Sequence, residues 1–137
     1  MSELRIINPP GLAKPSGYSY AIESGGGRLI HFSGHTAMTA EGAIEPLDDL
    51  PGQFLRALEN LRVTAQSAQI SLEDFARLRV YVTDIDSYKQ DRIEIGEIYR
   101  QFFGVHYPAM TLLEISRLWD DEALIEIEGT AVARSES

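Results

Sequence analysis

The sequence contains no cysteine and only three histidines. Without cysteine there can be no disulfide, no thiolate nucleophile and no cysteine-ligated zinc or iron–sulfur site. The histidines are scattered, so we expect no metal site. No apolar run reaches the roughly 18 residues that a membrane-spanning helix needs. The opening stretch "MSELRIINPP" lacks the apolar core of a signal peptide. We therefore expect a cytoplasmic protein with no membrane partner.

Basic side chains are also few: 12 Lys and Arg stand against 21 Asp and Glu, which gives a formal net charge of −9. A nucleic-acid-binding protein gains most of its affinity by neutralising phosphates, and the basic residues here are not clustered. We therefore expect a small-molecule ligand and no nucleic acid. The 137 residues fit one domain, residues 1–137, long enough to bury a core.

The first third of the chain predicts an irregular arm followed by two strands. Residues 1–17 are rich in Pro and Gly, whereas residues 18–24 and 28–34 have strand character. Three glycines, 25–27, lie between the two strands. A phosphate-binding loop would need a helix after it, but a strand follows, so we predict a hairpin turn.

The middle of the chain predicts two helices around a strand. Pro51 suits a first helical turn. An apolar stripe with helical spacing runs through Phe54, Leu58, Leu61, Ala65 and Ala68, and the helix should end near Ala68. Residues 77–84 alternate as a half-buried strand. Ser87 and Gln90 have the form of a capping box for the second helix, whose C-cap would be Gly104.

Two further strands, 109–115 and 124–134, complete the order ββ, α, β, α, ββ. This order predicts an α+β fold with a mixed sheet of about six strands and both helices on one sheet face. In the last strand the face opposite Ile125 and Ile127 mixes apolar residues with Glu126 and Glu128. If subunits pack through this face, the carboxylates lie near an interface, so we predict an oligomer.

Several motifs occur together, in order, over residues 7–134: "GYSYAI", "RLIHFSGH", "ALENLR", "VYVTDIDSY", "YRQFFG", "YPAMTLLEI" and "LIEIEGTAVA". In this the sequence resembles the reactive intermediate deaminase family (Rid or YjgF-like), which is also labelled L-PSP endoribonuclease and translation inhibitor. The resemblance implies a chorismate-mutase-like subunit, a homotrimer with a central barrel, and three ligand clefts between neighbouring subunits.

Deaminases of that family hydrolyse small enamines and imines to 2-oxo acids and ammonia without a cofactor. The resemblance implies that Glu126 orients the attacking water and that Tyr18 and Gly34 form part of the substrate pocket. Each has a simpler alternative: Glu126 as an ordinary acid on a polar strand face, and Tyr18 as a packing partner of Tyr20.

The family's carboxylate-binding arginine is missing. The deaminase motif reads Pro-Ala-Arg-Ser/Thr, whereas this sequence reads Pro108-Ala109-Met110-Thr111. Methionine cannot replace a planar cation with five donors. Loss of that contact costs ~2–5 kcal/mol if the carboxylate stays buried and unpaired. Met110 and Thr111 should still line the pocket, but 2-aminoacrylate-type imines are disfavoured as substrates.

His35 and Arg117 are the candidate replacements for the missing arginine. His35 follows the Ser-Gly turn where deaminases more usually carry glutamine, so it could be an acid, a base or an anion-binding group, or could only donate a hydrogen bond. Arg117 could reach the cleft, although a salt-bridging role is favoured. His106 is expected to be a solvated loop residue, and His31 a satisfied sheet residue.

Three functions follow, in decreasing order of preference. The first is a divergent Rid-type enzyme that hydrolyses or deaminates a small metabolite, with catalytic Glu126 and His35. The second is a trimer that binds a metabolite without catalysis. The third is the ribonuclease of the family label, which the net charge of −9 disfavours.

Overall fold

The computed structural model describes residues 4–134. Six strands and two long helices form an α+β structure, as predicted. The elements in chain order are β1 (Leu4–Ile7), β2 (Ala21–Ser24), β3 (Arg28–His35), α1 (Leu50–Ser67), the 3-10 turn η1 (Leu72–Asp74), β4 (Phe75–Val82), α2 (Ile85–Gln90), α3 (Arg92–Phe103), β5 (Ala109–Glu114) and β6 (Ile125–Ala133).

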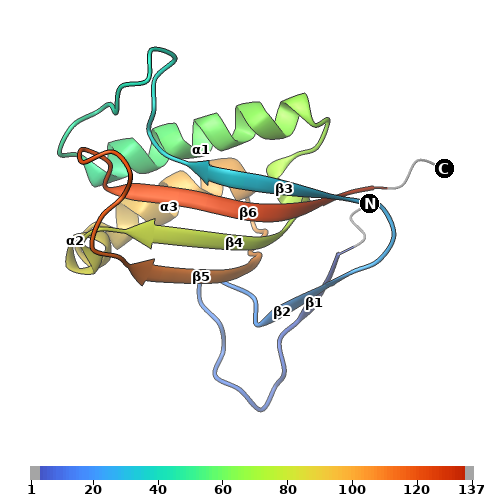
Figure 1. The fold of residues 1–137 in the computed structure, drawn as a ribbon. Coiled ribbons are helices and arrows are strands. Elements are labelled where there is room, and N and C mark those ends of the chain that lie inside the picture. Colours follow the sequence, from blue (N-terminus) through green and yellow to red (C-terminus); the bar gives the residue numbers. More distant parts are fainter. Residues whose placement is uncertain (1–3, 135–137) are drawn as a thin grey trace.

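The main sheet has four strands in the order β3-β6-β4-β5, with β4 and β5 parallel and the other pairs antiparallel. Helices α1 and α3 cover one face of this sheet, whereas no helix formed by residues 4–134 lies on its other face (Figure 1). The remaining strands, β1 and β2, form a separate antiparallel pair at the β5 side of the sheet (Figure 1). An isolated bridge between Ser19 and Ala109 joins that side to the start of β5.

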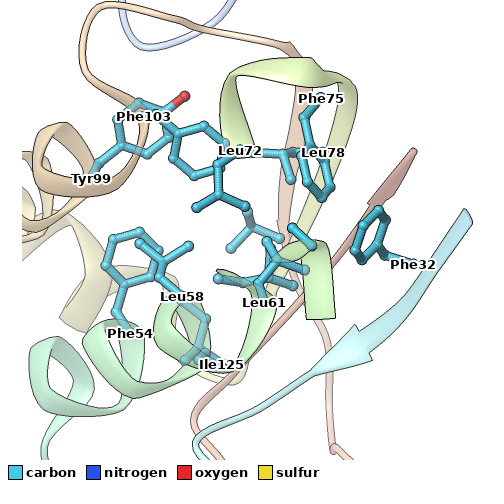
Figure 2. Close-up of a cluster of buried hydrophobic side chains, with 14 of the residues drawn as sticks. Phe32, Phe54, Leu58, Leu61, Leu72, Phe75, Leu78, Tyr99, Phe103 and Ile125 are labelled. Carbon is cyan, nitrogen blue, oxygen red and sulfur yellow. The ribbon is translucent and has the colours of Figure 1, made fainter. Parts of the chain in front are cut away.

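The core lies between the main sheet and the two long helices (Figure 2). Its largest fully buried side chains include Leu58, Leu61, Phe75, Phe103 and Ile125. The predicted stripe of α1 faces this core, because four of its five members are buried and Ala68 packs against them. The predicted apolar face of the first long helix is thus confirmed, and it packs against the apolar face of the sheet.

The N-terminal region differs from the prediction. Residues 4–7 of the predicted arm form β1, which pairs with β2, so Gly25–Gly27 connect strands of two different sheets and make no hairpin. The reason is tertiary: Gly27 has a φ of 76°, and a Cβ there would overlap the carbonyl of Ala133. This close approach directs β3 into pairing with β6. The six strands of the structure therefore divide between two sheets.

Helices α1 and α2 each begin directly after an aspartate whose side chain caps the helix. Asp49 caps α1 by accepting a hydrogen bond from the N–H of Gly52, with Pro51 in the first turn, and the helix ends before Ala68 as predicted. The capping box predicted at Ser87 is wrong. Asp84 caps α2 instead and accepts the N–H of Ser87, so the helix begins earlier and Ser87 lies in its first turn.

The predicted second helix is divided at Asp91 into α2 and α3, and α3 ends at Gly104 with φ 61°. Within residues 4–134, no helix combines the length and apolar character needed to cross a bilayer.

Candidate functional site

Gly34 and Glu126 meet where β3 and β6 end their pairing. The register shifts between Phe32 and His35, so Ser33 and Gly34 lie in an irregular part of β3. A Cβ at residue 34 would overlap the carboxylate of Glu126, so glycine is the residue that leaves room for this side chain. We call Gly34, His35 and Glu126 the β6 corner. The structure thus brings three of the predicted site residues together.

Glu126 has an altered acidity. Burial raises the pKa of its carboxyl group above the ordinary glutamate value, and the nearby carboxylates of Glu128 and Asp120 raise it further. The neighbouring His35 lowers it in part. A half-buried carboxylate whose pKa lies above the usual range is a better proton acceptor than an exposed glutamate.

The ring of His35 is held on both sides. Its Nδ1 lies 2.7 Å from the carbonyl oxygen of Ser33, which only accepts, so Nδ1 carries a hydrogen. Its Nε2 lies 2.8 Å from the hydroxyl of Thr64, which can donate to a neutral ring or turn its hydrogen to the carbonyl of Asn60, 3.2 Å away. Both nitrogens thus have protein partners, which fits the hydrogen-bonding role weighed for His35 better than a free acid or base.

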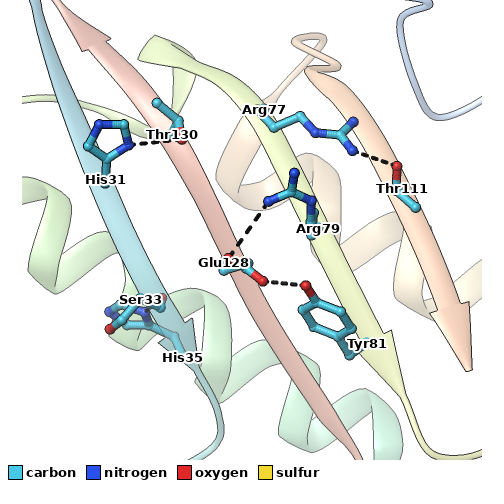
Figure 3. Close-up of polar contacts among 9 residues, drawn as sticks. All are labelled: His31, Ser33, His35, Arg77, Arg79, Tyr81, Thr111, Glu128 and Thr130. Carbon is cyan, nitrogen blue, oxygen red and sulfur yellow. Dashed lines mark hydrogen bonds and ion pairs between the residues drawn. The ribbon is translucent and has the colours of Figure 1, made fainter. Parts of the chain in front are cut away.

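The other predicted site residues lie at the β5 side. Met110 pairs with Leu78 and packs against the core, so it faces the helices. Thr111 points to the opposite face, where it accepts a hydrogen bond of 2.7 Å from Arg77 (Figure 3). Tyr18 packs edge-on against Tyr20, with ring centroids 5.3 Å apart, as the packing alternative expected.

These residues do not converge with the β6 corner in one chain. Strand β4 lies between β6 and β5, so Glu126 and Met110 are separated by two strand spacings, ~10 Å, even before their offset along the strands. Within one copy, the predicted site is therefore two partial sites.

Next to Met110 lies an open cavity of about 350 Å³, which we call the β5 pocket. Besides Met110, its lining includes Arg92, Arg100, Tyr88, Tyr99 and Tyr107. These arginines and tyrosines are not among the site residues expected from the sequence. The signal was present, since residues 92, 99 and 100 recur on one side of a helix, but nothing in the pattern says that this side borders β5.

The uncovered sheet face carries a polar network (Figure 3). The hydroxyl of Tyr81 donates to the carboxylate of Glu128, and Arg79 Nη1 lies 4.0 Å from the same carboxylate. The hydrogen bond to Glu128 raises the pKa of Tyr81. His31 lies on this face 3.5 Å from Thr130. The predicted carboxylate-bearing face is thus confirmed, with Tyr81 and the arginines as its missed partners.

Two other predictions have definite outcomes. His106 is not a solvated loop residue: it is half-buried, and its Nε2 donates to the carbonyl of Phe75 over 2.6 Å. The expectation failed because the loop packs back onto β4. Arg117 binds Asp121 over 2.8 Å in its own exposed loop, which is the salt-bridging role favoured from the sequence. Among residues 4–134, no three potential ligand side chains cluster as a metal site would require.

Comparison with known proteins places this geometry in a family. Residues 11–133 match the family model described as Endoribonuclease L-PSP. A RutC family protein of Pyrococcus horikoshii is 32% identical over 127 residues, covering 92% of this chain and 95% of that protein. TdcF of Escherichia coli, whose name refers to reactive intermediate deamination, is 30% identical over 109 residues, covering 77% of this chain and 80% of TdcF.

Comparison with solved structures supports the same family. The Rid-family protein YyfB of Yersinia pestis superposes with a TM-score of 0.86 at 32% identity, covering 96% of this chain and 99% of YyfB. TdcF with bound serine superposes with a TM-score of 0.65 at 29% identity, covering 94% and 98%. The predicted YjgF-like fold is therefore confirmed. The chain belongs to the endoribonuclease L-PSP family, the group also called Rid or YjgF-like proteins.

Proposed function

We propose that this protein is a cofactor-independent hydrolase that deaminates a small enamine or imine metabolite in the cytoplasm. It would act as one Rid/YjgF-like domain, assembled as a homotrimer with clefts between subunits. The observation that carries the proposal is the β6 corner, where a carboxylate with a raised pKa lies against a glycine that leaves space beside it.

In the proposed reaction Glu126 accepts a proton from water as the water oxygen bonds to the imine carbon. The carbon–nitrogen bond then breaks, the nitrogen leaves as ammonia after taking up protons, and an oxo compound remains. His35 and Tyr18 contact the substrate. His35 would hold its position through Ser33 and Thr64 and tune the acidity of Glu126.

Two observations support a homotrimer. The first is the separation of the predicted site residues, because a neighbouring copy can bring a second β5 side to the β6 corner. The second is the uncovered sheet face, whose half-buried Tyr81 and Glu128 form a network that a sheet-to-sheet contact would shield further. Intersubunit packing through that face would also give the barrel expected of the family.

A non-catalytic metabolite-binding trimer is the second candidate. It is favoured by Met110, which packs against the core where the deaminases carry a cation, and by TdcF, which was solved with bound serine. The ribonuclease of the family description has less support, because the net charge of −9 opposes phosphate binding. We expect no RNA cleavage once contaminating nucleases are removed.

The test is hydrolysis of imines generated in situ, with release of ammonia and oxo acid as the measurement. Glu126→Gln should lower turnover by ~10²–10⁴-fold, the range for a positioned proton acceptor. Glu59→Gln, on the exposed side of α1, is the matched control and should leave turnover unchanged. Equal turnover in Glu126→Gln and wild type would exclude this mechanism. Tight ligand binding without turnover would favour the second candidate.

A further inference from the structure

The β5 pocket has a charge that is unusual for this chain. Two arginines line it, and none of its lining residues is an acid, although acidic residues outnumber basic ones in the protein by 21 to 12. A pocket with two guanidinium groups and no carboxylate attracts an anion.

The two arginines of the pocket differ in their partners. Among residues 4–134, the Arg100 guanidinium makes no ion pair and no hydrogen bond. By contrast, Arg92 donates to the carbonyl of Lys89 over 2.9 Å. The Nη1 of Arg100 lies 3.4 Å from where a Cβ of residue 96 would stand. The guanidinium thus folds back along α3 over Gly96, toward the pocket that both residues line.

The rest of the lining is aromatic and apolar. Tyr99 stacks on Phe103 at 4.5 Å and on Tyr107 at 5.2 Å, with nearly parallel rings. The hydroxyl of Tyr99 is engaged, because it donates to the carbonyl of His106 over 2.7 Å. Tyr107 is thus the last ring of a three-ring stack, and Met110 supplies an adaptable apolar wall beside it.

These contacts define a ligand with two ends. We propose that the β5 pocket binds a small monocarboxylate with a planar apolar body, its carboxylate on Arg100 and its body between Tyr107 and Met110. A volume of about 350 Å³ lies within the range of sites for small metabolites. Arg100, on α3, would supply the charge that deaminases take from the residue at position 110.

The inference deepens the proposed function, on which it rests, by naming the substrate class: imines of aromatic or bulky apolar amino acids instead of the smallest ones. Binding of a stable carboxylate is measured without turnover. A failure of catalysis and a failure of this site are therefore distinguishable.

The experiment is calorimetric titration of the full-length protein with benzoate, its neutral analogue benzamide, acetate and inorganic phosphate. We expect benzoate to bind more tightly than the other three and to weaken as salt is added. Arg100→Gln should weaken benzoate by about tenfold or more and leave benzamide unchanged. The matched control is Arg117→Gln, which removes an exposed arginine paired with Asp121 and should bind benzoate as wild type does.

Each other outcome overturns the proposal. Equal benzoate affinity in Arg100→Gln and wild type would remove Arg100 from the site. A loss confined to Arg117→Gln would transfer the charge to the loop before β6. Phosphate or acetate binding as tight as benzoate would show a general anion site with no role for Tyr107 and Met110. If Glu126→Gln lowers turnover but Arg100→Gln leaves benzoate affinity unchanged, the proposed function stands and this inference fails.

Discussion

The β6 corner and the β5 pocket contrast in almost every property. The β6 corner holds a carboxylate with a raised pKa, a fixed histidine and a glycine that admits the carboxylate. The β5 pocket holds two arginines, stacked tyrosines and no acid. One region can accept a proton, and the other can hold an anion. Because β4 separates them in one chain, this division of labour argues for a site completed by a second copy.

After the loss of the Glu126 carboxylate itself, the largest expected effect comes from crowding the β6 corner. The Cβ of Gly34→Ala would overlap the carboxylate of Glu126 and force that side chain to move. Because a misplacement of about 1 Å costs on the order of 10²-fold in rate, turnover should fall by about that factor. Gly25→Ala is the control, since nothing lies within 4 Å of its Cβ position. Unchanged turnover in Gly34→Ala would separate Glu126 from the chemistry.

The next expected effect is a shift in the pH dependence of turnover, which tests the role of Glu126. Protonated Glu126 cannot accept a proton, so the acid limb of the turnover profile should lie above the ordinary glutamate pKa of ~4.3. Asp120 helps to raise the pKa of Glu126, so Asp120→Asn should shift that limb to lower pH. A limb that does not move with Asp120→Asn would assign it to another group.

The stability of the fold should also depend on the protonation of Glu126, but here the protonated form is the favourable one. A carboxyl group whose pKa is raised on folding favours the fold when protonated, and this contribution is lost as pH rises through the folded-state pKa. Glu126→Gln should therefore gain stability over wild type at neutral pH but not in mild acid, as measured by denaturant unfolding. If Glu126→Gln and wild type differ in free energy of unfolding by the same amount at neutral pH and in mild acid, the raised pKa of Glu126 is contradicted.

At the β5 pocket, Met110→Arg tests whether Arg100 already supplies the positive charge that deaminases have at position 110. If Arg100 binds the carboxylate, a third guanidinium in the pocket should raise turnover of small imines by less than about tenfold. It should also lower stability by ~1–3 kcal/mol, because the longer side chain crowds a packed position. A gain of several hundredfold would mean that Met110 alone redirects specificity and that Arg100 contributes little.

The smallest expected effect comes from a change on the uncovered sheet face. Two subunits would pack through this face and so bring the β6 corner and the β5 pocket together. Tyr81→Phe removes the hydroxyl that donates to Glu128, which should cost ~1 kcal/mol and lower the Tm by roughly 3–5 °C. If this face is an intersubunit contact, the decrease should be greater at low protein concentration. A decrease independent of concentration would place the network outside the interface.

Much of the fold was predictable because it rests on local patterns. The stripe of α1, the alternation in β4 and β6, and the termination at Gly104 each follow from periodicity or from a cap. The division into two sheets was not predictable, since the turn at Gly25–Gly27 fits a hairpin equally well. Only the tertiary approach of Gly27 to Ala133 decides which strands pair.

The candidate site was predictable only where its residues share strands. Gly34, His35 and Glu126 lie together because β3 pairs with β6. Arg100 was missed because its role depends on a helix packing beside β5. His106 was misplaced because its hydrogen bond to Phe75 crosses 31 positions of sequence, and no local pattern carries such information.

The most direct test of a shared site is turnover by mixed trimers. Glu126→Gln and the charge reversal Arg100→Glu would each be prepared alone and then co-expressed in equal amounts, with the mixed assembly verified by mass. If Glu126 of one subunit works with Arg100 of its neighbour, about one quarter of the clefts in random mixtures regain both residues. Turnover should then return to about a quarter of the wild-type rate. Turnover no higher than in the separate variants would contradict a site built from two copies.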